Sequence, residues 1–319
     1  MRTWVRIRRG LKPAKALLET HWGKRVVHLA RWAVPTLLIA YLAWRLSRIG
    51  WQAVWQARPG ALAFYATALI SFYVQPIGDL FIYRNLLGSG RALTLGVLLR
   101  KRFINTFLDY SGELYFFFWA RKNLRLRRGM LFHAVKDSNV LSASAGLGMI
   151  WLMLLAVALS GGLKLTMFQH SGMWTFLSLG SLPLVLALTL FLGGRRVSML
   201  SRTQMLATFA IHLGRGIMQL VLEFMVWWLS GALPTAAACL QFVALRVLVT
   251  RLPLVPNKDL IFVGVGIAVA GALDVSAPNV AAVLVLMTAL WQVQNLVFVG
   301  FPWFLERFQV RHRAGLTAS

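Results

Sequence analysis

The sequence predicts an all-helical, polytopic membrane protein with about eight transmembrane helices, together with one or two re-entrant or broken-helix segments. Its 319 residues are 58% hydrophobic and only 13% charged, which is unusual for a soluble domain of this length. Several apolar runs reach the about 20 residues that a helix needs to cross the hydrocarbon core. The charged residues cluster between these runs and are mostly Lys and Arg, as is typical of cytoplasmic loops.

The basic composition indicates contact with membrane lipid rather than with nucleic acid. Lys and Arg number 34 against 9 Asp and Glu, which gives a net charge of +25. In a soluble protein this charge would suggest nucleic acid, but here the cations lie where topology and anionic headgroups require them. The single cysteine, Cys239, lies in an apolar run and excludes an intramolecular disulfide framework and a cysteine metal site.

The chain divides into three predicted regions. Residues 1–25 combine aromatic and aliphatic residues at helical spacing with many cations, which suits an amphipathic helix on an anionic leaflet. A disordered basic tail is the alternative, and we expect no cleavable signal because a small-residue cleavage site is missing after the first apolar run. Residues 26–306 are expected to form the helical transmembrane domain, and residues 307–319 a basic cytoplasmic tail.

The first predicted span covers residues 26–44 and runs outward, followed by an interfacial connector over residues 46–58. Residues 60–83 return inward. Pro76 and Gly78 interrupt this run just before Asp79, so we expect the helix to kink there. A basic elbow over residues 84–102 follows on the cytoplasmic side.

The stretch Arg102–Trp119 is apolar enough to enter a bilayer, yet it carries Asn105, Asp109 and Glu113 at helical spacing. Both of its flanks are strongly basic, so both ends should lie on the cytoplasmic face. We therefore predict a re-entrant hairpin that turns at Tyr110–Gly112 and takes two carboxylates into the membrane, where such groups are costly. The alternative is a short, ordinary span whose acids sit near its ends.

Two further spans are predicted over residues 130–159 and 173–192, and the first carries His133, Lys136 and Asp137 along one face. The next helix, residues 203–230, carries a polar stripe in which residues follow one another at three- or four-residue spacing. The stripe consists of Thr208, His212, Arg215, Gln219 and Glu223. An Arg and a Glu on one face of an apolar helix must face protein or water, either as a binding site or as a static interhelical network.

Residues 235–252 form the next predicted span, with Arg246 on one face, and the chain then breaks at Arg251–Pro256. The Gly-rich residues 260–275 either span or form a second re-entrant element. Residues 281–304 form the last span.

Two regions, residues 75–120 and 250–275, each join a proline-interrupted segment to a Gly-containing apolar stretch. Paired broken helices are the best sequence indication of a binding site near the middle of the membrane. Whether the two halves form a true inverted repeat stays open.

The sequence contains no His-Glu-x-x-His, Gly-x-Ser-x-Gly, Walker or paired-aspartate motif. Its six His residues are scattered, without metal-ligand spacing. We therefore predict no cofactor and no metal, and a transporter-like protein rather than an enzyme.

What remains is a set of intramembrane charges of both signs, which would line one hydrated cavity. Arg can bind phosphate bidentately while carboxylates hold an amine or a sugar hydroxyl, so such a cavity suits a phospholipid or glycolipid headgroup. The main headgroup-binding candidates are Asp109, Glu113, Arg215, Glu223, Arg246 and Arg251. Secondary candidates are Asp79, Arg84, Asn105, Lys136, Asp137, His212 and Gln219.

A family resemblance rests on short motifs. Arg84-Asn-Leu-Leu, Asn105 and Ser111-Gly-Glu113 before an aromatic run and Arg121 resemble the N-terminal half of the lysylphosphatidylglycerol synthase transmembrane (flippase-like) family. Arg251-Leu-Pro-Leu-Val-Pro256 before a Gly-rich helix is similar to the proline-glycine segment of that family.

The likeness covers most of residues 60–300, with two departures. The family usually continues Pro-Gly-Gly-Leu-Gly with a Glu soon after, where this chain has Pro256-Asn-Lys-Asp-Leu260. Its last helix often carries an Arg where this one has Trp291 and Gln292. The resemblance implies a stand-alone member without the soluble aminoacyl-transferase domain, and lipid translocation or handling rather than lipid aminoacylation.

We therefore expect a multi-pass protein of the bacterial inner membrane, with both termini cytoplasmic. It would bind an amphiphilic lipid and move it between leaflets, downhill or coupled to a proton on Glu113 or Glu223, or present it to a lipid-synthesis enzyme. Two alternatives stay open: an intramembrane transferase with His133, Asp137 or His212 as base, and a non-transporting scaffold whose polar stripe only joins helices. No nucleic-acid partner is expected, and the oligomeric state, a homo-oligomer included, stays open.

Overall fold

The computed structural model describes residues 47–88, 93–106, 110–124, 126–159, 198–250, 258–272 and 275–300, and isolated positions within 40–44 and 185–193. The chain forms two compact units, Met1–Ile49 and Gly50–Ser319, and the account below concerns the second. All regular structure in its described part is helical, so the all-helical class is confirmed there. The predicted segments 1–25 and 307–319, and most of the predicted spans 26–44 and 173–192, lie outside the described residues.

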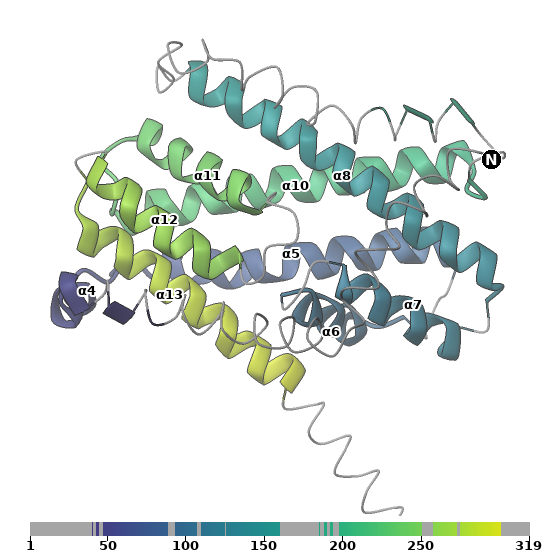
Figure 1. Ribbon diagram of the computed structural model, residues 1–319, viewed down its shortest axis with the longest axis horizontal. Helices are drawn as coiled ribbons and strands as arrows, with labels where there is room; N and C mark the ends of the chain where they lie inside the picture. Colours follow the sequence, from purple (N-terminus) through teal and green to yellow (C-terminus); the bar gives the residue numbers. More distant parts are fainter. Residues whose placement is uncertain are drawn as a thin grey trace, which may run out of the picture. The chain divides into compact units, whose positions relative to one another are not determined.

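Three long helices form the frame of the second unit: α5 (Leu62–Leu87), α8 (Arg128–Leu159) and α10 (Arg202–Ser230). Helix α10 packs against both α5 and α8, and Figure 1 shows α5 and α10 running alongside each other. The helical conformation of α5 continues through Pro76 to Leu87, so the expected interruption there does not end the helix. Packing along α10 holds the segment helical although Pro76 lacks the N–H for one backbone hydrogen bond.

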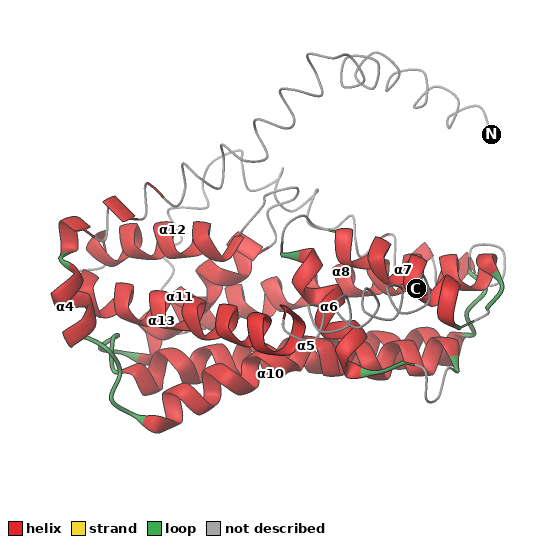
Figure 2. Cartoon of the chain, turned by 90° about the horizontal axis from the view of Figure 1, so that it is seen from below, coloured by secondary structure: helices red, strands yellow, loops and turns green. Residues whose placement is uncertain are grey.

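Shorter helices complete the described part. These are α4 (Trp51–Gln56), α6 (Leu95–Asn105), α7 (Ser111–Asn123), α11 (Ala236–Thr250), α12 (Lys258–Ala272) and α13 (Ala277–Asn295), which continues as a π-helical turn over Leu296–Gly300. Helix α12 packs against both α11 and α13. Figures 1 and 2 both place these three helices together at one end of α5. Helices α6 and α7 lie farther along α5.

Helices α6 and α7 pack against each other as a helical hairpin. The Gly112 backbone N–H donates to Asn105 Oδ1 at 3.2 Å, and the Ser111 hydroxyl donates to the Ile104 carbonyl at 2.8 Å. A Cβ atom on Gly112 would overlap the Lys101 carbonyl oxygen, so only glycine permits this approach. The two helices have 11 and 13 residues, about 17 and 20 Å at the helical rise, and neither is long enough to cross a bilayer.

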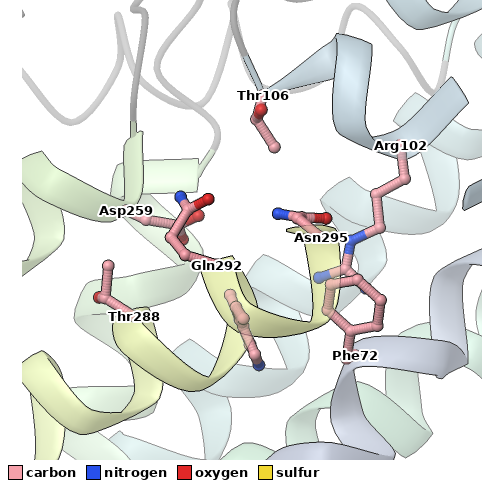
Figure 3. Close-up of a pocket in the computed structure, with 8 residues that line it drawn as sticks. Phe72, Arg102, Thr106, Asp259, Thr288, Gln292 and Asn295 are labelled. Carbon is pink, nitrogen blue, oxygen red and sulfur yellow. The ribbon is translucent and has the colours of Figure 1, made fainter. Parts of the chain in front are cut away.

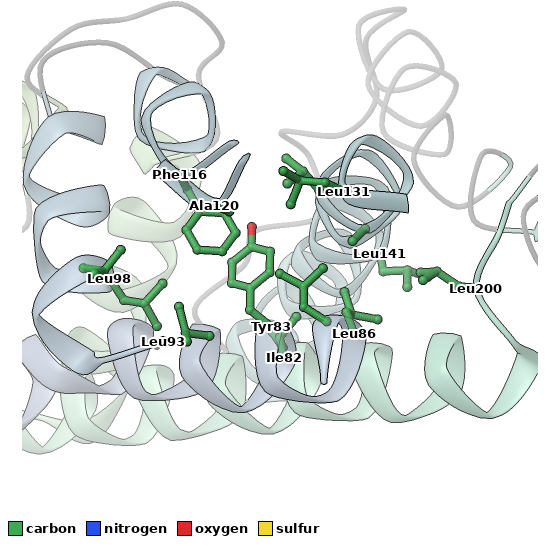
Figure 4. Packing of buried hydrophobic residues seen from close by; sticks show 14 of the residues in the cluster. Ile82, Tyr83, Leu86, Leu93, Leu98, Phe116, Ala120, Leu131, Leu141 and Leu200 are labelled. Atoms are coloured by element: carbon green, nitrogen blue, oxygen red, sulfur yellow. The ribbon is translucent and has the colours of Figure 1, made fainter. Parts of the chain in front are cut away.

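An apolar cluster holds this hairpin against α5 and α8. The Tyr83 ring of α5 lies 4.0 Å, centre to centre, from the Phe116 ring of α7. Leu98 of α6 and Leu131 of α8 are fully buried in the same cluster (Figure 4). The hairpin is therefore part of the packed core, and its position relative to α5 is fixed by side-chain contacts.

Three described helices are long and apolar enough to cross a membrane: Gly129–Val157, Arg202–Ser230 and Ala277–Gly300. Eight spans are not shown. Helix α11, expected to span, is apolar but has only 15 residues, and so has α12, about 22 Å each against a hydrocarbon core of about 30 Å. Their described lengths do not suffice for crossing.

Candidate functional site

Four charged side chains, one each from α5, α6, α7 and α10, lie close together, and we call them the Asp79 network. Lys101 Nζ on α6 lies 2.6 Å from Asp79 Oδ2 on α5 and 3.3 Å from Glu113 Oε1 on α7. Arg215 on α10 pairs with Asp79 Oδ1, and its Nη2 donates to the Ser142 hydroxyl of α8 at 3.2 Å. Two carboxylates and two cations therefore neutralise each other where five helices meet.

Glycine residues bring these side chains within reach. A Cβ atom on Gly78 would lie 2.8 Å from Arg215 Cδ, so the aliphatic part of Arg215 crosses α5 at a position without a side chain. Gly112 does the same for the α6–α7 contact, which places Glu113 beside Lys101. The Lys101 ammonium also lies 5.4 Å from the centre of the Tyr83 ring, within the range of a cation–π contact.

A second group of charges, the Arg246 network, joins α10, α11 and α12. Arg246 Nη1 lies 3.4 Å from Glu223 Oε1, and its Nη2 lies 3.2 Å from Asp259 Oδ1. The guanidinium also faces the Trp291 ring of α13, 4.5 Å from its centre. Within the described residues, Glu223 Oε2 is buried without a hydrogen-bond partner. Glu113 Oε2 of the Asp79 network is likewise buried without a partner there. The two networks differ in charge balance: among the described residues the Arg246 network has one cation for two carboxylates, and the Asp79 network has two of each.

A pocket adjoins the Arg246 network and shares Asp259 with it (Figure 3). Its empty volume, including the open solvent at its mouth, is about 300 Å³. The lining residues come from α5, the end of α6, α12 and α13; they are Phe72, Arg102, Thr106, Asp259, Thr288, Trp291, Gln292 and Asn295. Phe72, Trp291 and Asn295 are buried and Gln292 is exposed, so the pocket has a mainly aromatic floor and a polar rim.

A third polar cluster lies on α8. The buried Asp137 carboxylate lies 3.0 Å from Lys136 Nζ, accepts a hydrogen bond from the Ser198 hydroxyl, and lies 3.8 Å from His133 Nδ1. The neighbouring Ser138 hydroxyl contacts Nε2 of His212 on α10 at 3.2 Å. These contacts tie α8 to α10 and to the segment before it, and none of these residues lines the pocket.

The structure brings the main candidates together in two groups where the sequence predicts one cavity. Glu113 and Arg215 join the Asp79 network, and Glu223 and Arg246 form the other. Asp109 and Arg251 lie outside the described residues.

The secondary candidates have different environments. Asp79 is the centre of its network, whereas Arg84 is exposed in the last turn of α5. Lys136, Asp137 and His212 belong to the α8 cluster. Asn105 accepts the hydrogen bond from Gly112 and therefore stabilises the hairpin, and Gln219 is half-buried on α10.

Lys101, Arg102 and Trp291 are missing from the sequence-based candidates. The sequence predicts a basic elbow at Lys101 and Arg102, because cations between apolar runs are typical of loops. Residues 95–105 are instead helical, and α6 directs Lys101 to Asp79 and Arg102 to the pocket. The helical spacing of the apolar residues around these cations was the available signal.

No known family model matches this chain, and no similar protein was found among curated proteins or solved structures.

Proposed function

We propose that this chain is an integral membrane protein that binds a lipid by its headgroup and moves it between the leaflets of a bacterial inner membrane. The observation that carries the proposal is the placement of paired charges inside helices whose exposed faces are apolar. This distribution is the reverse of that in a soluble protein, where charged residues are mostly exposed.

The reversed distribution recurs on three helices. On α10, Thr208, His212 and Glu223 are buried, whereas Leu206, Ile217, Met218, Val221, Met225 and Trp228 are exposed. Asp79 of α5 is buried and Ile70, Ile77 and Phe81 are exposed; on α13, Gln294 and Asn295 are buried and Val293, Leu296, Val297 and Phe298 are exposed. Apolar surface of this extent favours contact with lipid, and ionisable residues in such helices are a sign of function.

Lipid is the ligand class that the chemistry favours. Guanidinium groups suit phosphate, carboxylates suit amines and hydroxyls, and the aromatic residues beside them suit the glycerol and acyl region. A polar cleft open to lipid lowers the cost of moving a headgroup through hydrocarbon. The proposal agrees with the resemblance to the lysylphosphatidylglycerol synthase transmembrane family, which implies a stand-alone lipid translocator.

The α6–α7 hairpin is proposed to enter the membrane and return to the same face. Both helices are shorter than the hydrocarbon core, and Arg121 and Lys122 in the last turn of α7 favour the cytoplasmic side for that end. The hairpin carries Lys101, Arg102 and Glu113, so it would bring three ionisable groups to membrane depth.

A carboxylate could couple movement to protons. Glu113 Oε2 and Glu223 Oε2 are both buried without a hydrogen-bond partner among the described residues. A protonated carboxyl group costs less to bury than a carboxylate, so either side chain suits proton uptake during movement.

The test is a lipid-movement assay in vesicles. Purified protein is reconstituted with a fluorescent phosphatidylglycerol, and dithionite quenching of the outer leaflet reports exchange between leaflets. We expect Glu113→Gln to slow exchange about tenfold or more, because it removes a charge that interacts with Lys101. Arg215→Ala should have an effect at least as large. Lys122→Gln, an exposed charge change on the same helix, should leave the rate unchanged.

Wild-type exchange in both Glu113→Gln and Arg215→Ala would reject the proposed site. Absence of exchange with the wild-type protein would reject translocation. Mass spectrometry of the recovered lipid separates the enzyme alternative, since a transferase would change the lipid covalently.

A further inference from the structure

Arg102 of α6 is a half-buried cation for which the described part of the chain shows no ion pair. Its Nη1 atom is buried and has no hydrogen-bond partner among the residues that the structure describes. The guanidinium carbon lies 4.1 Å from the centre of the Phe72 ring and 5.3 Å from that of Trp291, so two aromatic rings hold it in place. Leaving a buried guanidinium N–H unpaired is costly, and an anionic ligand that accepts a hydrogen bond from it would remove that cost.

The neighbouring cations are already paired. Lys101 and Arg215 share the carboxylates of the Asp79 network, and Arg246 lies between Glu223 and Asp259. Arg102 belongs to neither network, and within the described part of the chain its charge is not taken up by an ion pair. An incoming anion could pair with it without breaking an existing ion pair.

The pocket around Arg102 offers few other donors. The Thr106 and Thr288 hydroxyls already donate to backbone carbonyls, at 2.6 and 2.8 Å, and the Trp291 indole N–H donates to the Ala68 carbonyl at 3.3 Å. The remaining side-chain donors of the lining are Arg102 and the amides of Gln292 and Asn295, which lie on the same pocket (Figure 3). One guanidinium with two amides suits an oxyanion.

Asp259 determines the orientation of that oxyanion. Its carboxylate lines the same pocket and repels negative charge, and its side chain is 41% exposed. An anionic group must therefore lie at the Arg102 and Asn295 side. A substituent that carries an amine or hydroxyl donor can face Asp259.

We propose that this pocket is a phosphate-binding subsite in which Arg102 pairs with the phosphate group of the ligand and Asn295 donates to it. The proposal rests on the proposed function for its natural source of phosphate, a lipid headgroup. The recognised chemistry is the phosphate itself, which free inorganic phosphate also offers. The two sources are separated by the experiment.

Binding is measured by microscale thermophoresis on the purified full-length chain in maltoside detergent. Three probes are used: dihexanoyl-phosphatidylglycerol, its phosphate-free analogue dihexanoylglycerol, and inorganic phosphate. We expect Arg102→Gln to raise the Kd for the phospholipid about tenfold or more, and Asn295→Ala to raise it by a smaller factor. Arg127→Gln, the same change at an exposed residue between α7 and α8, should change the Kd less than about twofold.

Thermal stability distinguishes a ligand-binding role from a structural one. Because Arg102 is unpaired without ligand, Arg102→Gln should leave the melting temperature unchanged or higher while it weakens binding. A lower melting temperature of Arg102→Gln, together with an unchanged Kd of Asn295→Ala for the phospholipid, would overturn the proposal.

The three probes give distinct outcomes. Arg102-dependent binding of the phospholipid, without competition from dihexanoylglycerol, supports a lipid phosphate. Equal binding of both lipids, independent of Arg102, overturns the phosphate subsite and leaves lipid binding intact. Arg102-dependent binding of inorganic phosphate alone supports the subsite and rejects lipid as its source. Failure of all three probes to bind the wild-type chain overturns both proposals.

Discussion

The Asp79 network and the Arg246 network are built from the same residue types but differ in charge balance. Both oxygens of Asp79 have a cationic partner, and its side chain is only 7% exposed. In the Arg246 network, one described cation serves both Glu223 and Asp259, Asp259 is 41% exposed, and the adjoining pocket is lined by Asp259 and Arg102. A charge-balanced, buried group holds helices together, whereas a group with an excess carboxylate beside a pocket leaves capacity for a ligand.

Asp79→Ala should give the largest effect. It leaves Lys101 without its closest partner and Arg215 without its carboxylate, and loss of one member of a buried ion network costs about 3–5 kcal/mol. The free energy of unfolding in mixed detergent and dodecyl sulfate measures this. Adding Lys101→Met should restore part of the loss because one unpaired charge is removed. A loss below about 1 kcal/mol would contradict the assigned role of this network.

Gly112→Ala should have an intermediate effect. The new methyl group would overlap the Lys101 carbonyl and separate α6 from α7, at a cost of about 1–3 kcal/mol measured in the same unfolding experiment. Gly148→Ala on α8 is the matched control, since no atom lies within 4 Å of the added Cβ. The control should be neutral or stabilising by up to about 1 kcal/mol, because alanine favours helix more than glycine does. Equal effects of the two changes would contradict the close packing of the hairpin.

Asp259→Asn should have the smallest effect on stability, below about 1 kcal/mol, because its ion pair with Arg246 is partly exposed and Glu223 remains as a partner. Asp79→Asn serves as the comparison in the same unfolding assay and should cost clearly more. If the two asparagine variants were equally destabilising, the distinction between a closed and an open network would fail.

Helix positions were predictable where long apolar runs carried a polar stripe. Helices α8 and α10 begin within two residues of their predicted starts at 130 and 203, and α10 ends at the predicted residue, Ser230. A hairpin near Gly112 was predictable, but its turn was predicted too late: Ser111 and Gly112 lie in the first turn of α7, where Gly112 permits the close contact with α6. Helix α6 was not predictable, since its three consecutive cations are typical of a cytoplasmic loop.

The contacts between site residues were less predictable than the identity of the residues that face inward. The stripe on α10 indicates which side chains face inward, but it carries no information on their partners. Asp79 and Arg215 are 136 residues apart in the sequence, and Asp79 and Lys101 are 22 apart. Such pairs depend on how the helices pack. The glycines that permit this packing cannot be told from other apolar residues in a hydropathy pattern.

Lys101 and Arg102 are neighbours on one short helix, and each successive residue of an α-helix is turned by about 100° around its axis. The first holds Asp79 and Glu113, and the second lies against Phe72 and Trp291. Helix α6 therefore connects the two sites: a rotation of α6 that moves the Arg102 guanidinium deeper into the pocket would also move the Lys101 ammonium away from Asp79 and Glu113. Ligand occupancy of the Arg102 pocket and the ion pairs of Lys101 would therefore be coupled through the orientation of α6.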